Sequence, residues 1–335
     1  MSSLQTGFEG KIEIIGKGSF GAVSVLSGRP VAFKHVLNPS RTSELKDEFE
    51  MLSSLYEFCN SGSFFVIPRP LAYYDPEIST DFCSANTGSP STPNTRRWQT
   101  NRPLVVKSDF SALKLDSAAY AMERVLPLPL SVGLFIRQLF YPSGHETAIL
   151  PSICRLYFGK VIADSDRPSR FFNSANFPLD VARYTQLANV LAKDPQDDYP
   201  TVDEIAHGMG EMLGRLHSQG YDARDIEFVM GGASFSGVAM HVFDWNQMRR
   251  WSKTVVDVHL LVEAFFVNDP YYPRPRPEDQ LYQNFCVGYM AQYPQDSTSD
   301  AQIRLAEVFL REIEAEQARR TSAGKPTKAS AQVSS

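Results

Sequence analysis

The stretch Gly16-Lys17-Gly18-Ser19-Phe20-Gly21-Ala22-Val23 decides how the chain begins to fold, because it places three glycines between two strand-forming segments. The segments 11–15 and 22–26 are rich in apolar and β-branched residues, which predicts a hairpin with the glycines in its turn. A G-x-G-x-x-G-x-V turn between strands lets backbone N–H groups approach phosphate oxygens, which larger side chains would prevent. We therefore expect a phosphate-bearing ligand at Gly16, Gly18, Gly21 and Val23, although three glycines also suit a plain turn.

A buried ion pair is predicted between the third strand and the helix that follows it. The strand is Val31-Ala32-Phe33-Lys34-His35-Val36, and apolar residues recur at helical spacing in the segment 41–58. Glu48 falls among those apolar positions, and burying a carboxylate without a partner is costly. Lys34 is the expected partner. The alternatives are a solvated Lys34 at a sheet edge and a pairing acid elsewhere on the helix, Glu44 or Glu50.

The second half of the chain is more helical. The segment 201–219 is its strongest predicted helix, because Thr201 and Glu204 form a capping-box pair and Gly220 follows as a stop signal. Two short apolar strands, 228–230 and 239–243, are expected to form a hairpin. Further helices are expected at about 255–266 and 299–320.

With these elements in place, residues 10–125 resemble the small lobe of a protein-kinase-like fold. The resemblance implies that Lys34 holds the α- and β-phosphates of ATP and that Glu48 orients Lys34. It also implies that Met122, Glu123 and Arg124 form the hinge to a large lobe, where backbone groups bind adenine.

The same resemblance gives roles to acids in the second half. Asp222 and Glu227 have the spacing of the base and the metal-binding Asn in a kinase catalytic loop, so Asp222 would orient or deprotonate the acceptor and Glu227 would bind Mg²⁺. A second register makes Asp225 the base, and the sequence does not decide between the two. Asp244 ends the hairpin where kinases carry D-F-G, which implies the principal Mg²⁺ ligand; a plain turn residue is the alternative.

The chain also departs from the protein kinases. It lacks the H-R-D tripeptide, carries Trp245-Asn246 in place of F-G, and has no A-P-E string after the short link 246–253. A peptide substrate is therefore disfavoured, and small-molecule kinases of the aminoglycoside and choline type are the closer parallel. The same departures support an alternative, a catalytically inactive pseudokinase that acts as a regulatory or protein-interaction module.

Five strings extend the resemblance over nearly the whole chain: CRLYFGK (154–160), FNSANFPLDV (172–181), DARDIEFVMGG (222–232), FDWNQM (243–248) and NDPYYPRP (268–275). Through them the chain resembles a fungal protein-kinase-like family of unknown function, some of whose members are labelled zinc-finger proteins. The four cysteines are far apart and none belongs to a C-x-x-C pair, so the sequence argues against structural zinc.

Composition limits the partners. The 335 residues carry 33 Lys+Arg and 38 Asp+Glu, a formal net charge of -5, which is the wrong sign for coating nucleic acid. No apolar stretch approaches the roughly 18 residues of a bilayer span, so no membrane is expected. No secretory signal is visible at the N-terminus, and we expect a cytoplasmic or nuclear location.

Together these observations predict an α+β protein with a bilobal protein-kinase-like fold. Residues 1–125 would form the small antiparallel-sheet lobe with a mobile insertion at 76–117, residues 126–320 a mainly helical large lobe, and 321–335 a disordered tail. The expected function is binding of Mg²⁺ and ATP and transfer of a phosphoryl group to a small-molecule or other non-peptide acceptor.

Overall fold

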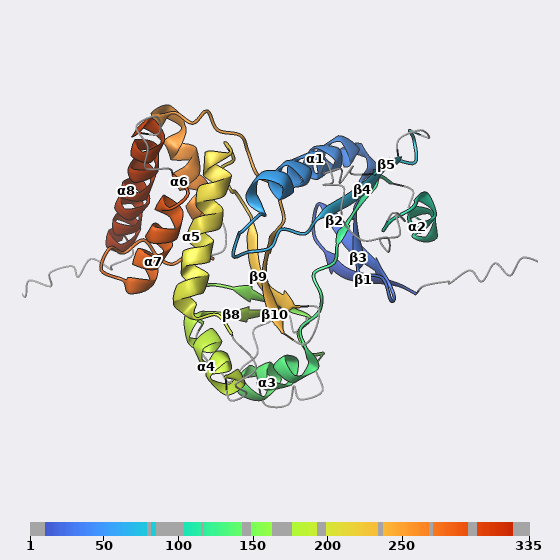
Figure 1. The fold of residues 1–335 in the computed structure, drawn as a ribbon, viewed down its shortest axis with the longest axis horizontal. Coiled ribbons are helices and arrows are strands. Elements are labelled where there is room, and N and C mark those ends of the chain that lie inside the picture. Colours follow the sequence, from blue (N-terminus) through green and yellow to red (C-terminus); the bar gives the residue numbers. More distant parts are fainter. Residues whose placement is uncertain are drawn as a thin grey trace, which may run out of the picture.

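A computed structural model describes residues 11–78, 82–84, 104–114, 117–142, 149–162, 176–192, 199–233, 237–267, 271–293 and 300–323. Within these ranges the protein is a mixed α+β fold with two sheets (Figure 1), so the predicted fold class is confirmed at that level.

The first sheet is antiparallel throughout and has the strand order β1-β2-β3-β6-β4-β5. Its strands are β1 (Ile12–Lys17), β2 (Gly21–Leu26), β3 (Val31–Val36), β4 (Pro70–Tyr74), β5 (Phe82–Ser84) and β6 (Ala119–Glu123). The three N-terminal strands agree with the predicted segments, because two short turns fix their pairing locally.

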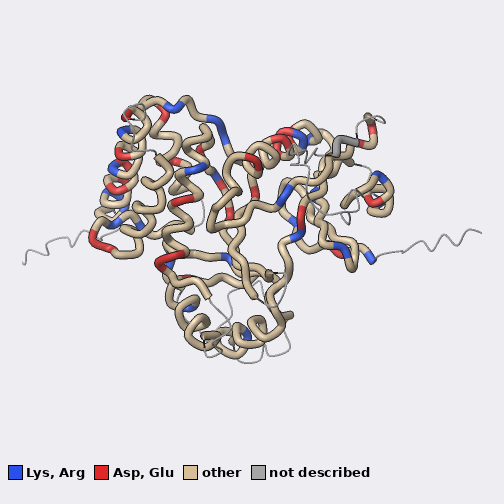
Figure 2. The backbone as a smooth tube through the Cα atoms, viewed as in Figure 1, with Lys and Arg blue, Asp and Glu red and all other residues tan. Residues whose placement is uncertain are grey.

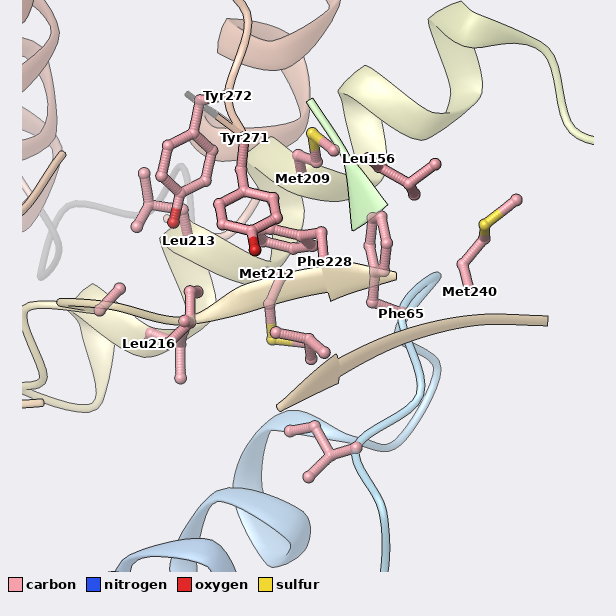
Figure 3. Packing of buried hydrophobic residues seen from close by; sticks show 14 of the residues in the cluster. Phe65, Leu156, Met209, Met212, Leu213, Leu216, Phe228, Met240, Tyr271 and Tyr272 are labelled. Atoms are coloured by element: carbon pink, nitrogen blue, oxygen red, sulfur yellow. The ribbon is translucent and has the colours of Figure 1, made fainter. Parts of the chain in front are cut away.

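Helix α1 (Thr42–Cys59) follows the 3-10 turn η1 (Pro39–Arg41) and packs beside the first sheet. The chain after α1 then reaches the second sheet. The Val66 amide donates to the Met240 carbonyl at 2.8 Å, and the Val242 amide donates to the Val66 carbonyl at 3.1 Å. Phe65 packs edge-on against Phe228 with ring centroids 4.7 Å apart (Figure 3), so the segment between α1 and β4 joins the second sheet through backbone bonds and core packing.

The second sheet has the order β10-β9-β7-β8. The predicted hairpin is confirmed as β9 (Glu227–Gly232) and β10 (Val238–Phe243), while β7 (Ile153–Leu156) and β8 (Asn176–Leu179) add a parallel pair. Residues on one face of this sheet, among them Phe228 and Met240, join Leu156, Met209 and Met212 in the larger core (Figure 3).

The helices after β6 lie in the same half of the molecule as the second sheet (Figure 1). They are α3 (Leu130–Phe140), α4 (Val181–Leu191), α5 (Val202–Ser218), the 3-10 turn η2 (Val255–Asp257), α6 (Val258–Val267), α7 (Gln280–Met290) and α8 (Asp300–Ala323). The predicted capping box of Thr201 and Glu204 starts α5. Figure 1 shows α6, α7 and α8 gathered on the side away from the first sheet. None of the described helices has the length and apolar run that a membrane span requires.

Two expectations about loosely structured segments need correction. Residues 104–114, inside the predicted insertion 76–117, contain α2 (Lys107–Ala112) and pack on the first sheet, with Phe110 edge-on to Phe33 at 5.3 Å. Three apolar side chains in eleven residues are enough to anchor this part. Residues 79–81, 85–103 and 115–116 lie outside the described residues. Residues 321–323 of the predicted tail continue α8, and 324–335 are not described.

Candidate functional site

Lys34 lies at the centre of the candidate site. It is paired between Val23 of β2 and Tyr120 of β6, and only 11% of its side chain is exposed. Its Nζ donates to Glu48 Oε1 at 2.6 Å and to Asp244 Oδ1 at 3.1 Å. The predicted Lys34–Glu48 ion pair is confirmed, and the lysine also reaches a carboxylate that follows the last strand of the second sheet.

The two competing acids on α1 are excluded as partners of Lys34. Glu44 is exposed and pairs with Arg41, and Glu50 is exposed. Glu48 is buried and its Oε1 also accepts from the Tyr120 hydroxyl at 3.2 Å. Burial raises the pKa of Glu48, although Lys34 acts in the opposite direction. Burial alone would lower the pKa of Lys34, but the carboxylates of Glu48 and Asp244 together raise the pKa of this lysine. Lys34 is therefore charged at neutral pH.

The glycine turn lies over this lysine. Phe20, at its tip, is buried, with its ring centroid 5.4 Å from Lys34 Nζ. A Cβ at Gly21 would stand 2.4 Å from the His35 carbonyl oxygen, so packing on β3 requires that glycine. A Cβ at Gly18 would meet nothing within 4 Å, and one at Gly16 only ordinary contact with Val23. Packing therefore explains why a glycine is needed at position 21, but it does not require a glycine at position 16 or 18.

Of the hinge predicted at Met122, Glu123 and Arg124, the first two residues end β6 and Arg124 directly follows it. Met122 pairs with Ala32 and Pro70, the Glu123 amide donates to Arg69 at 2.9 Å, and the Arg124 amide donates to Pro30 at 3.0 Å. These two amides are already bonded within the protein, so neither is free to donate to adenine, and adenine binding by the other backbone groups of these residues stays a prediction. Within the described ranges Val125, the next residue, makes no backbone hydrogen bond.

Asp222 is a structural acid. Its side chain is fully buried and accepts from the Arg224 amide at 3.1 Å, the Arg249 amide at 2.9 Å and Arg249 Nε at 2.6 Å. Three donors occupy its two oxygens and tie the loop after α5 to the segment after β10. The carboxylate is therefore committed to these contacts and is not exposed at the surface.

Asp225 is the more accessible of the two candidate bases. It is half-buried, and the Gln247 side-chain amide donates to its Oδ2. Its φ of 63° is left-handed, as are those of Ala223 (55°) and Asp244 (70°). Such conformations cost on the order of 1 kcal/mol each in non-glycine residues and tend to gather at functional sites. The geometry therefore favours the register with Asp225 as base.

The two predicted metal ligands have different surroundings. Glu227 accepts from Arg155 Nη2 at 2.7 Å, whereas the Asp244 side chain is 34% exposed and bonds to Lys34 through Oδ1. Across the described residues no three His, Cys, Asp or Glu side chains converge as a metal site. Asp244 fits an Mg²⁺ ion that takes its other ligands from phosphates and water, as Mg²⁺ commonly does. Glu227 is instead paired with the Arg155 guanidinium.

The comparisons with known proteins find one family. A family described as "Zinc finger protein" matches residues 240–301, and no curated protein matches the chain. No kinase family matches it either, so the membership in a kinase-like family expected from the five strings is wrong.

The matched segment does not carry the ligands of a zinc finger. Its only Cys and His residues are His241, His259 and Cys286, fewer than the four a structural zinc site needs. Burial lowers the pKa of His241 to about 4 and raises that of Cys286 to about 11. The name of the family therefore does not correspond to a set of zinc ligands in this segment.

Proposed function

We propose that this protein has a bilobal, kinase-like arrangement, binds ATP with Mg²⁺ between its two sheets, and transfers the γ-phosphoryl group to a hydroxyl of a small-molecule or other non-peptide acceptor. The observation that carries the proposal is the double contact of Lys34 with Glu48 and Asp244. A buried cation shared by an acid of α1 and an acid that directly follows β10 is suited to receive phosphate oxygens.

Lys34 would bind the phosphates while Glu48 keeps its ammonium in place. Gly16 and Gly18, which packing does not require, would let the turn approach the phosphates. Val125, whose backbone groups form no hydrogen bond with the described residues, would serve as the adenine contact in place of the predicted hinge residues. Asp244 would hold Mg²⁺, which when bound neutralises the phosphate charge.

In the transfer step the acceptor oxygen bonds to the γ-phosphorus as the bond from that phosphorus to the β–γ bridging oxygen breaks, and ADP leaves. Asp225 takes the proton of the acceptor hydroxyl. Its position beside Gln247, on a loop braced by Asp222, supports this role.

The segment after Asp244 supports a non-peptide acceptor. Trp245 and Met248 are buried, the Arg249 amide bonds to Asp222, and the Trp251 indole donates to the His217 carbonyl at 3.1 Å. The first part of this segment is therefore packed against the end of α5 and the loop after it.

The decisive test is calorimetric titration of ATP, with and without Mg²⁺, into the wild type and two variants. We expect Mg²⁺-dependent binding that Lys34→Ala abolishes and Lys46→Ala, an exposed lysine on α1, retains. Absence of binding to the wild type would overturn the proposal. Binding without ATP consumption across a panel of hydroxyl acceptors would favour the pseudokinase alternative.

A further inference from the structure

The Arg155–Glu227 pair is a charged contact that the proposed function leaves unused. Arg155 lies on β7, Glu227 begins β9, and their closest atoms are 2.7 Å apart. A third of the arginine side chain is exposed, and its Nη1 lies 3.4 Å from the Tyr157 hydroxyl. The pair is therefore ordered but within reach of a ligand.

Strand register places this pair on the face of the second sheet that is turned away from the larger core. Arg155 stands opposite Val229, and Val229 stands opposite His241. Directly paired residues share a face, and Glu227 lies two residues from Val229, so it shares that face as well. The intervening residues, Phe228 and Met230, belong to the larger core.

The same face contacts the segment 125–126, which follows β6. Gly231, two residues beyond Val229, lies so close to that segment that a Cβ would come within 2.6 Å of the Val125 side chain. At the other end Glu227 pairs with Phe243, the residue directly before Asp244. The guanidinium of Arg155 is therefore bonded to the residue that pairs with Phe243, the neighbour of the carboxylate that contacts Lys34.

We propose, resting on the function proposed above, that Arg155 stands in for a second metal ion: it neutralises Glu227, supplies a fixed positive charge beside the phosphates, and leaves one Mg²⁺ bound through Asp244. A second divalent cation at Glu227 would face the guanidinium at contact distance and would have to displace it. Arginine is suited to this place because its planar fork can bond a carboxylate and a phosphate oxygen together.

The test counts metal ions directly. Mn²⁺ is titrated into the wild type saturated with a non-hydrolysable ATP analogue, and free Mn²⁺ is followed by electron paramagnetic resonance. We expect one Mn²⁺ per chain. Two Mn²⁺ per chain would overturn this inference alone, whereas a wild type that binds no analogue would overturn the proposed function with it.

Variants separate charge from structure. Arg155→Gln should lower phosphoryl transfer on the order of 10²-fold, the size of effect seen when one fixed donor to developing charge is lost, and should admit a second, weaker Mn²⁺. Arg155→Lys should keep one Mn²⁺. Arg320→Gln, which breaks an Arg–Glu pair on α8, should match the wild type. An Arg155→Gln protein unchanged in both readouts would overturn the inference.

Discussion

Two buried carboxylates, Glu48 and Asp222, each pair with a cation, yet their surroundings differ. Asp222 has both oxygens bonded by three donors. Glu48 places two donors on Oε1, while its buried Oε2 has no hydrogen-bond partner among the described residues. The saturated acid is suited to hold two loops together, and the unsaturated acid is suited to a contact that rearranges when a ligand arrives.

The largest effect should come from breaking the saturated site. Asp222→Asn removes the charge that faces Arg249 and should lower the free energy of unfolding by about 3 kcal/mol, measured by urea denaturation. Asp225→Asn, on the same loop, should stay within about 0.5 kcal/mol of the wild type while abolishing transfer. Equal destabilisation by both variants would contradict the assignment of a structural role to Asp222 and a role in transfer to Asp225.

Glu48→Gln should cost less stability, about 2 kcal/mol in urea denaturation, because Lys34 keeps Asp244 as a partner. The same variant should abolish ATP binding in calorimetry. Glu50→Gln, an exposed acid on the same helix, is the control for both measurements. A Glu48→Gln protein that binds ATP as the wild type does would show that Lys34 needs no help in orientation.

In the glycine turn above Lys34, two substitutions with smaller expected effects separate a glycine required for packing from one required for ligand binding. Gly21→Ala should lower the free energy of unfolding by about 1.5 kcal/mol, because its Cβ would press on the His35 carbonyl. Gly18→Ala should leave stability unchanged and weaken ATP binding in calorimetry. If Gly18→Ala binds ATP with wild-type affinity, phosphates do not approach that residue.

Acid pH should destabilise the protein through protonation of His217, which lies near the end of α5. Burial lowers the pKa of His217, whose Nδ1 lies 2.9 Å from the Tyr289 hydroxyl, to about 3. The unfolded chain therefore binds the proton more readily, and stability falls as the pH drops from about 6.5 toward 3, by up to about 1.4 kcal/mol per pH unit. Urea denaturation at pH 7.0 and 5.5 should show this loss, and His217→Phe should reduce it. The exposed His259→Phe should leave it unchanged, and a slope unaffected by His217→Phe would locate the titration elsewhere.

Local patterns were sufficient to predict the elements that local interactions form. The three N-terminal strands, α1 and the capped α5 follow from turn residues, helical periodicity and caps that lie close together in the chain. The pairing of Lys34 with Glu48 could also be predicted, since an apolar helix face leaves a carboxylate few partners.

Nonlocal pairing is what the sequence could not provide. The parallel pair of β7 and β8 joins two four-residue strands, too short for a periodic signal. The partners of the acids, Arg155, Gln247 and Arg249, depend on that tertiary arrangement, so the spacing of Asp222 and Glu227 suggested roles that their contacts do not support. The signal that was available for the segment around α2 was its spaced apolar residues, Val105, Phe110 and Leu113, which the polar composition before them obscured.

Figure 2 shows Lys/Arg and Asp/Glu positions interspersed along α8. On this helix Glu316 forms ion pairs with Arg319 and Arg320. The buried charges near Lys34 differ from these in being held by groups far apart in the chain.

The backbone bonds of Val66 to Met240 and Val242 have a consequence for the order of folding. They join positions separated by more than half of the chain, so they form late in synthesis and pay a large loop-closure entropy. Lys34 and Glu48 can meet as soon as the first sheet and α1 exist. Asp244 joins them only after the last strand of the second sheet has emerged from the ribosome, so the complete charge cluster marks a chain whose two sheets have both folded.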